Sequence, residues 1–233
     1  RRSEDDLLAG GADPTLTTKA GRTALHHAAA EGRAPAVVPL LVLAGAEIDR
    51  RFDRAEGWFG TRGTTALHLA AAREAGAPMA AALLAVRADP DARDSAGRTP
   101  LHRAVRGARH SRVIELLLAA GADVDAEDVE DRTPLHIAAR HGSVPAVVRR
   151  LLSEGADADA ESAPEDGAPQ TPLRLAAAHG RSVEIFRMLI DASGAPCAAD
   201  ANGRPALDYA ERNAALVNSD PYWMLHDRCA TAD

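Results

Sequence analysis

Apolar residues along the chain fall into short clusters that come in pairs, and each pair is followed by a polar turn. The first cluster of a pair is a leucine followed by small residues, as in 66–72 and 135–139, and the second is a run of larger aliphatic residues, as in 113–118 and 147–152. Apolar residues spaced three or four apart are typical of an amphipathic helix. The pattern predicts pairs of short α-helices joined by polar loops, repeated along the chain.

The first cluster of each pair recurs with a regular period. Six segments align on a leucine, at spacings of 42, 34, 34, 38 and 34 residues. These leucines are Leu25, Leu67, Leu101, Leu135, Leu173 and Leu207. In the blocks that read T-P-L, such as 99–101, the threonine can cap the helix and the proline suits the first helical position, where its missing N–H costs nothing. The first helix of each pair is therefore expected to begin at this proline, and to be buried only against neighbouring repeats.

With the strings G-R-T-P-L-H-R-A (97–104) and D-R-T-P-L-H-I-A (131–138) in co-registered copies, the chain resembles the ankyrin-repeat family, whose repeat has about 33 residues and a T-P-L-H-x-A signature. The resemblance extends from residue 7 to about residue 215. It implies an all-α ankyrin-repeat solenoid of stacked helix-turn-helix units with extended finger loops. We expect the following division: a partial leading repeat (1–20), a repeat with a long aromatic finger (21–62), two repeats (63–96, 97–130), a repeat with an acidic loop (131–169), another repeat (170–202) and a degenerate C-terminal capping repeat (203–233).

The repeated histidines and the aromatic residues near the C-terminus are expected to stabilise the fold. The resemblance implies that the histidine of each T-P-L-H block hydrogen-bonds turn backbone and fixes the helix start; these are His26, His68, His102 and His136. In the last repeat Asp208 takes the place of this histidine. Three aromatic residues gather near that end, and we expect them to cover the last open core: Tyr209, Tyr222 and Trp223.

A candidate partner-binding face follows from the register of the first helices. If leucine and alanine face the core, the residue after each T-P-L-H histidine and those three or four positions later face the concave groove. The first column reads His27, Leu69, Arg103, Ile137 and Leu175. The second column begins with Glu31 and continues with Arg73, Arg106 and Arg140. The resemblance implies protein partners, bound through this groove and the finger tips, and the side chains suit a partner with both carboxylates and apolar groups.

The longest predicted finger, 48–63, holds three of the seven aromatic residues of the chain, Phe52, Trp58 and Phe59. One interpretation is an anchor patch for a partner, because aromatic residues dominate binding hot spots. The other is that the finger folds over its neighbours and buries these rings internally. The sequence leaves the two equally open.

Composition narrows the class of partner. The chain has 233 residues and a formal net charge of −7, which counts against a nucleic-acid binder. It has no apolar run long enough to span a membrane, so no membrane partner is expected. The acids concentrate in 121–131 and 155–170, where they either attract a basic segment or cap and solvate the turns. Two cysteines, Cys197 and Cys229, are too few for a disulfide framework, and we expect them to be incidental in a cytoplasmic, monomeric protein.

No signature of catalysis, cofactor binding or metal binding appears in the chain. The expectation is therefore a non-catalytic protein-interaction module with no cofactor and no metal. The alternative is a noncanonical enzyme or small-molecule-binding protein that uses the groove lined by arginine and histidine. A deep, closed pocket would favour that alternative, and a shallow trough would favour protein binding. Because residue 1 is Arg and the first repeat is cut, we expect a fragment or processed form, in which a purely structural or regulatory role of a longer chain is a third possibility.

Overall fold

The computed structural model describes residues 13–52, 62–107, 112–141, 144–163 and 168–230. Within these ranges there are twelve helices and no strand, so the fold is all-α as predicted. By its internal contacts the chain divides into two compact units, residues 1–123 (unit 1) and 124–233 (unit 2).

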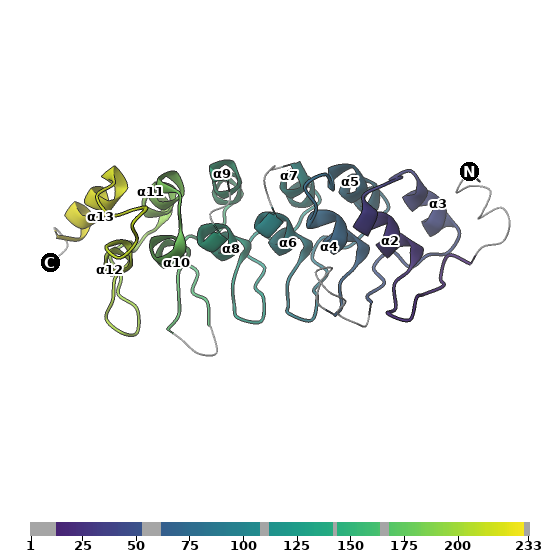
Figure 1. Cartoon of the computed structure of the whole chain (residues 1–233), viewed down its shortest axis with the longest axis horizontal. Coiled ribbons are helices and arrows are strands. Elements are labelled where there is room, and N and C mark those ends of the chain that lie inside the picture. Colours follow the sequence, from purple (N-terminus) through teal and green to yellow (C-terminus); the bar gives the residue numbers. More distant parts are fainter. Residues whose placement is uncertain (1–12, 53–61, 108–111, 142–143, 164–167, 231–233) are drawn as a thin grey trace. The chain divides into compact units, whose positions relative to one another are not determined.

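Unit 1 consists of three helix pairs. The inner helices are α2 (Ala24–Glu31), α4 (Ala66–Ala71) and α6 (Pro100–Gly107), and the outer helices are α3 (Val37–Leu43), α5 (Ala77–Ala85) and α7 (Arg112–Ala119). Inner helices pack on inner ones and outer helices on outer ones, while each pair also packs internally. Figure 1 shows the finger loops of this unit extending beyond the row of inner helices.

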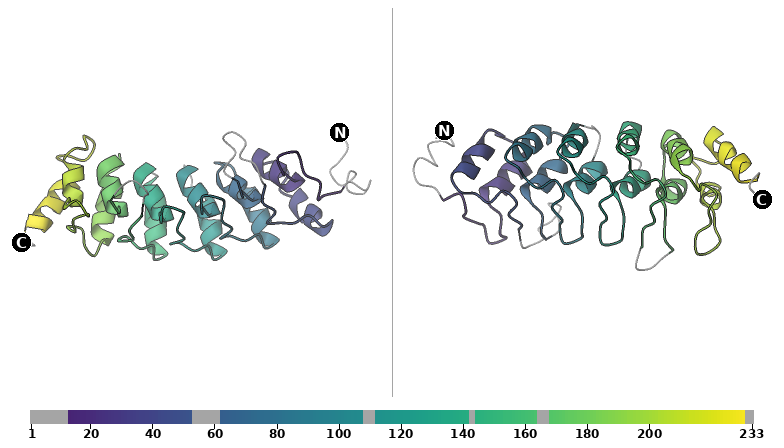
Figure 2. Two further views of the ribbon diagram at one scale, coloured as in Figure 1. Left: turned by 90° about the horizontal axis from the view of Figure 1, so that it is seen from below. Right: turned by 180° about the vertical axis from the view of Figure 1, so that it is seen from behind.

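Unit 2 repeats this arrangement. Its inner helices are α8 (Pro134–His141), α10 (Pro172–His179) and α12 (Ala206–Ala210), and its outer helices are α9 (Pro145–Ser153), α11 (Val183–Ala192) and α13 (Asp220–Ala230). The two further views in Figure 2 show the same two layers of helices within the unit. Each expected repeat from 21–62 to 203–233 holds one helix pair, although the repeat boundaries themselves stay a prediction.

The sequence signals for helix starts act as expected. Pro100, Pro134 and Pro172 are the first residues of α6, α8 and α10. The aligned leucines are almost completely buried in five repeats, with exposed fractions of 0–2% for Leu25, Leu67, Leu101, Leu135 and Leu173. Leu207, in the short helix α12, is only half-buried. At the ends of three outer helices, Gly45, Gly121 and Gly155 have φ values of 102°, 88° and 93°, which the absence of a side chain makes accessible.

Three of the repeat histidines, His26, His68 and His136, use both ring nitrogens for hydrogen bonds, one to the start of their own helix and one to the next finger. The backbone N–H of Thr65 donates to Nδ1 of His68 over 3.3 Å, so Nε2 carries the proton and donates to the carbonyl of Arg98 over 2.9 Å. His26 bridges Thr23 to the Thr64 carbonyl, and His136 bridges Thr133 to the Gln170 carbonyl. Burial lowers the pKa of His26 and His68 to about 4, although the carbonyl bonds act in the opposite direction. The bonds to the threonines fix the helix starts, as the resemblance implied. The bonds of these neutral imidazoles to the next finger also link successive repeats.

Arginine replaces histidine in the repeat that contains α10. Arg174 is 3% exposed, and its Nη2 donates to the carbonyl of Ala198 over 3.1 Å, in the finger that follows α11. Its Nη1 lies 3.4 Å from a carboxylate oxygen of Glu161. The connection between one helix and the next finger is thus kept, with a permanent positive charge in place of a titratable ring.

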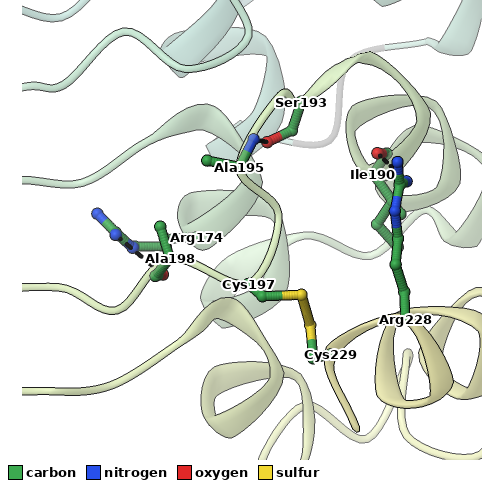
Figure 3. The surroundings of a disulfide bond; sticks show 8 residues. All are labelled: Arg174, Ile190, Ser193, Ala195, Cys197, Ala198, Arg228 and Cys229. Carbon is green, nitrogen blue, oxygen red and sulfur yellow. Dashed lines mark hydrogen bonds between the residues drawn. A yellow bond between two sulfur atoms is a disulfide. The ribbon is translucent and has the colours of Figure 1, made fainter. Parts of the chain in front are cut away.

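The C-terminal repeat is closed by α13 and by a disulfide. Cys197, in the finger before α12, is bonded to Cys229 in α13, with 5.4 Å between their Cα atoms (Figure 3). Nearby, Nη1 of Arg228 donates to the carbonyl of Ile190 over 3.2 Å. The expectation that the cysteines are incidental is therefore wrong. They lie 32 residues apart in the sequence and meet because α13 packs on α11 and α12.

The three aromatic residues near the C-terminus differ in how far they are buried. Tyr222 is 7% exposed and packs in the core, as predicted for a capping residue. Tyr209, in α12, donates from its hydroxyl over 2.6 Å to Oδ2 of Asp200 in the last finger. Trp223 is 48% exposed and stands edge-on to both Tyr222 and His226, so it covers the core only in part.

Candidate functional site

The inner-helix face is the side of the inner helices that is turned away from the outer helices of the same unit. The sequence register assigns eight residues to this face. In unit 1, His27 lies on α2, Leu69 on α4, Arg73 just after α4, and both Arg103 and Arg106 on α6. In unit 2, Ile137 and Arg140 lie on α8 and Leu175 on α10. Their role as one binding face stays a prediction.

The three apolar residues of this set are less accessible than expected. Leu69, Ile137 and Leu175 have exposed fractions of 5%, 6% and 5%. We predicted open apolar spots, but stacked inner helices lie close enough to cover most of each side chain. Only a shallow part of their surface is left for a partner to contact.

Arg73 makes a structural contact across two repeats. Its Nη1 donates to the carbonyl of Ala30, one of the free carbonyls at the end of α2. A Cβ atom on Gly32, which has a φ of 66°, would lie 2.8 Å from Nε of Arg73. The glycine thus allows both the turn and the close approach of the guanidinium, whose positive charge suits a helix C-terminus.

Arg103 is held by a buried carboxylate. Its Nη2 lies 2.6 Å from Oδ2 of Asp94, whose side chain has no exposed surface. The other carboxylate oxygen accepts the backbone N–H groups of Ala96 and Arg98 over 2.9 and 3.1 Å. The sequence interpretation missed Asp94, although a signal exists. Asp128 and Asp200 occupy the equivalent position in the fingers of their repeats, and each accepts the backbone N–H groups of the residues two and four positions later.

A small hollow on this face brings three predicted residues together. It has a volume of about 120 Å³ and is named here the Leu69 pocket; its lining consists of Ala30, Thr64, His68, Leu69, Ala72, Arg73 and Arg103. Leu69, Arg73 and Arg103 were predicted, whereas His27 and Arg106 do not line it. The hollow is well below the volume of about 300–1,000 Å³ that small-molecule sites usually have.

Arg106 and Arg140 remain as exposed cations of the inner-helix face in their respective units. Arg106 lies in the last turn of α6 and is exposed. The pKa of His179, at the end of α10, is lowered mainly by burial and to a smaller extent by the positive charge of Arg140. Both guanidinium groups are therefore available to acidic groups of a partner.

One of the three aromatic residues predicted to bind a partner, Phe52, is buried. Phe52 has an exposed fraction of 0%, so it is part of the core and is not available to a partner. Its carbonyl accepts the N–H of Gly63 over 3.0 Å, which closes the base of the finger. Trp58 and Phe59 lie outside the described residues, and their predicted role stays a prediction.

Aspartates in the turns form hydrogen bonds with the backbone of the following repeat. In unit 1 the carboxylate of Asp91 accepts the backbone N–H of Asp123 over 2.9 Å, and in unit 2 that of Asp125 accepts the N–H of Asp157 over 3.0 Å. Asp128 also pairs with Arg132, with 2.8 Å between Oδ2 and Nη2. For Asp125 and Asp128, which belong to the acidic segment 121–131, the capping interpretation applies, and the attraction of a basic partner does not need to be invoked.

In the part of the chain that the structure describes, no three side chains of His, Cys, Asp or Glu gather in a way that could hold a metal ion. Within the same residues, every helix is too short or too polar to cross a lipid bilayer.

Comparison with known proteins gives one result. The family model described as ankyrin repeats (3 copies) matches residues 5–94, 37–128, 71–162 and 135–219. No curated protein matches the chain. The matched ranges cover most of the sequence and include every inner helix, so the chain belongs to the ankyrin-repeat family.

Proposed function

We propose that this chain is a non-catalytic protein-recognition module that binds its partner through the inner-helix face and the finger tips. Ankyrin repeats are generally protein–protein interaction modules. The observation that carries the proposal is the pair of exposed arginines, Arg106 in unit 1 and Arg140 in unit 2, each on an inner helix whose opposite side is buried. Rigid helices fix the backbone positions from which these arginines extend, so a partner needs to order only the side chains.

The size of the Leu69 pocket supports a protein partner over a small molecule. A volume of about 120 Å³ accommodates one side chain, not a metabolite bound on most of its surface. The surrounding face is shallow, because its leucine and isoleucine side chains are nearly covered. A shallow surface with arginines is the pattern that protein partners use.

Arginine charge reversal tests this proposal. Tagged wild-type chain and the double variant Arg106→Glu/Arg140→Glu are used to capture proteins from extracts of the native host, and the bound proteins are quantified by mass spectrometry. The matched control reverses two exposed arginines of outer helices, Arg112→Glu/Arg187→Glu. The proposal expects specific partners that the control retains and the inner-face variant loses. Equal capture by all three proteins would contradict it.

The oligomeric state and compartment are further parts of the proposal. We propose a monomer, which light scattering after size-exclusion chromatography would test directly. The expected cytoplasmic location stays a prediction, and the disulfide between Cys197 and Cys229 counts against it, because such bonds persist mainly in oxidising compartments.

A further inference from the structure

We infer that the Leu69 pocket binds one apolar side chain of a partner peptide in which carboxylates lie next to that side chain. The inference rests on the proposed function, because it names the peptide chemistry that unit 1 would recognise on its inner-helix face. It adds a specific anchor site and a sequence preference, neither of which follows from membership of the family.

The interior of the pocket suits an apolar group. Leu69, Ala30 and Ala72 contribute aliphatic surface. His68 also lines the pocket, but both of its ring nitrogens are already bonded, Nδ1 to the N–H of Thr65 and Nε2 to the carbonyl of Arg98. The imidazole therefore has no polar atom left for a ligand, so the part of the pocket formed by Leu69, Ala30, Ala72 and His68 suits an apolar group.

The volume limits the occupant to a single group. An apolar cavity of roughly 150 Å³ is known to hold benzene. At about 120 Å³, the Leu69 pocket has room for one branched aliphatic side chain or one small ring. The rest of the ligand must lie outside the pocket, along the inner-helix face, which is the geometry of a peptide with one anchor residue.

The charge at the rim selects acidic neighbours for this anchor. Arg73 and Arg103 both line the pocket. Asp94 lies 2.6 Å from Nη2 of Arg103 and offsets its charge, so the positive charge that a ligand meets comes mainly from Arg73. Glu31 and Glu74 follow Ala30 and Arg73 in the chain but do not line the pocket. Aspartate or glutamate beside the anchor can meet Arg73, whereas lysine or arginine would be repelled.

The rim of the pocket offers a substitution that fills it without disturbing the core. Ala72 is exposed at the end of α4, so Ala72→Phe places a ring over the opening. Ala85 is exposed at the end of the outer helix α5, and Ala85→Phe is the matched control with the same change of side chain. Circular dichroism of both variants verifies that the helical fold is retained.

The probe is a random peptide library displayed on phage and selected on the immobilised wild-type chain. We expect enriched sequences with one apolar residue beside Asp or Glu. A labelled peptide of this kind should bind about ten- to a hundredfold more weakly to Ala72→Phe and within about twofold of wild type to Ala85→Phe. Replacing the anchor residue of the peptide with alanine should cause a similar loss on wild type and little further loss on Ala72→Phe.

The outcomes separate this inference from the proposal on which it rests. Failure to enrich any peptide, enrichment without the apolar and acidic pattern, or equal affinity for wild type and Ala72→Phe would overturn the pocket as an anchor site. If Arg106→Glu still weakens capture of the native partner in that case, the proposed function stands while the inference fails. If neither substitution affects any binding, both are wrong.

Discussion

The ring of Phe52 stands edge-on against the imidazole of His26, with 5.3 Å between ring centroids and 80° between ring planes. The guanidinium carbon of Arg22 lies 5.2 Å from the centre of the same phenyl ring. An aromatic residue in the finger that precedes α4 thereby packs on the histidine that fixes the start of α2. The contact ties the base of this finger into the core of unit 1.

The Phe52→Ala substitution should therefore destabilise the fold. Removing a fully buried phenyl ring leaves a cavity and should lower the free energy of unfolding by about 3–5 kcal/mol. Urea denaturation followed by circular dichroism measures the change. Leu43→Ala, at a leucine of α3 that is 85% exposed, is the control and should change stability by less than about 0.5 kcal/mol. Equal small effects of both substitutions would show that Phe52 is not a core residue.

Stability should fall as the pH is lowered from 6.5 toward 4. In the folded chain burial lowers the pKa of His26 and His68 from 6.5 to about 4, and the pKa of His136 is lowered in the same way. Between these pH values the unfolded chain binds protons that the folded chain excludes, so the loss begins near pH 6.5 and is complete below pH 4. For His26 and His68 it amounts to about 3 kcal/mol each.

The His68→Gln variant isolates one of these contributions. Glutamine retains a hydrogen-bonding side chain but does not titrate, so the variant should lose less stability than wild type over the same pH interval. Comparing slopes removes the shared contributions of Asp49 and Asp91, whose pKa is raised mainly by burial. Identical slopes of the unfolding free energy against pH for wild type and His68→Gln would rule out a titration of this histidine.

Reduction of the disulfide should loosen the C-terminal repeat. A bond that closes a loop of this length stabilises a fold by about 3–4 kcal/mol in the chain-entropy model, here between Cys197 and Cys229. Peptide mapping without reductant should recover the two cysteines in one linked fragment. Unfolding of wild type should become easier with reductant, while Cys197→Ser/Cys229→Ser should be insensitive to it. Free thiols in the oxidised, folded protein would contradict the pairing.

Features that repeat with the period of the chain could be predicted from the sequence. Pro100 and Pro134 begin helices and Leu101 and Leu135 are buried, because the signals for these properties are local and recur in each copy. The hydrogen bonds of His26 and His68 followed from the same register through the resemblance to ankyrin repeats. The family assignment and the all-α fold are therefore both confirmed.

Features that depend on a single long-range neighbour could not be predicted in this way. Arg73 contacts the carbonyl of Ala30, which lies 43 residues earlier, and Cys197 meets Cys229 through the packing of α13. Phe52 packs on His26, a contact between the finger and α2 of the same repeat. In the candidate site, the register selected Leu69 as an open apolar spot but did not indicate how closely stacked helices would cover it.

The most direct test of the central claim is the affinity of the native partner, once captured, for the inner-face variant Arg106→Glu/Arg140→Glu, measured by isothermal titration calorimetry. Reversing two exposed cations that meet acidic groups should weaken binding at least about tenfold, with the effect declining at high salt. The outer-helix variant Arg112→Glu/Arg187→Glu should bind like wild type. Unchanged affinity of the inner-face variant, with native circular dichroism, would contradict recognition through the inner-helix face.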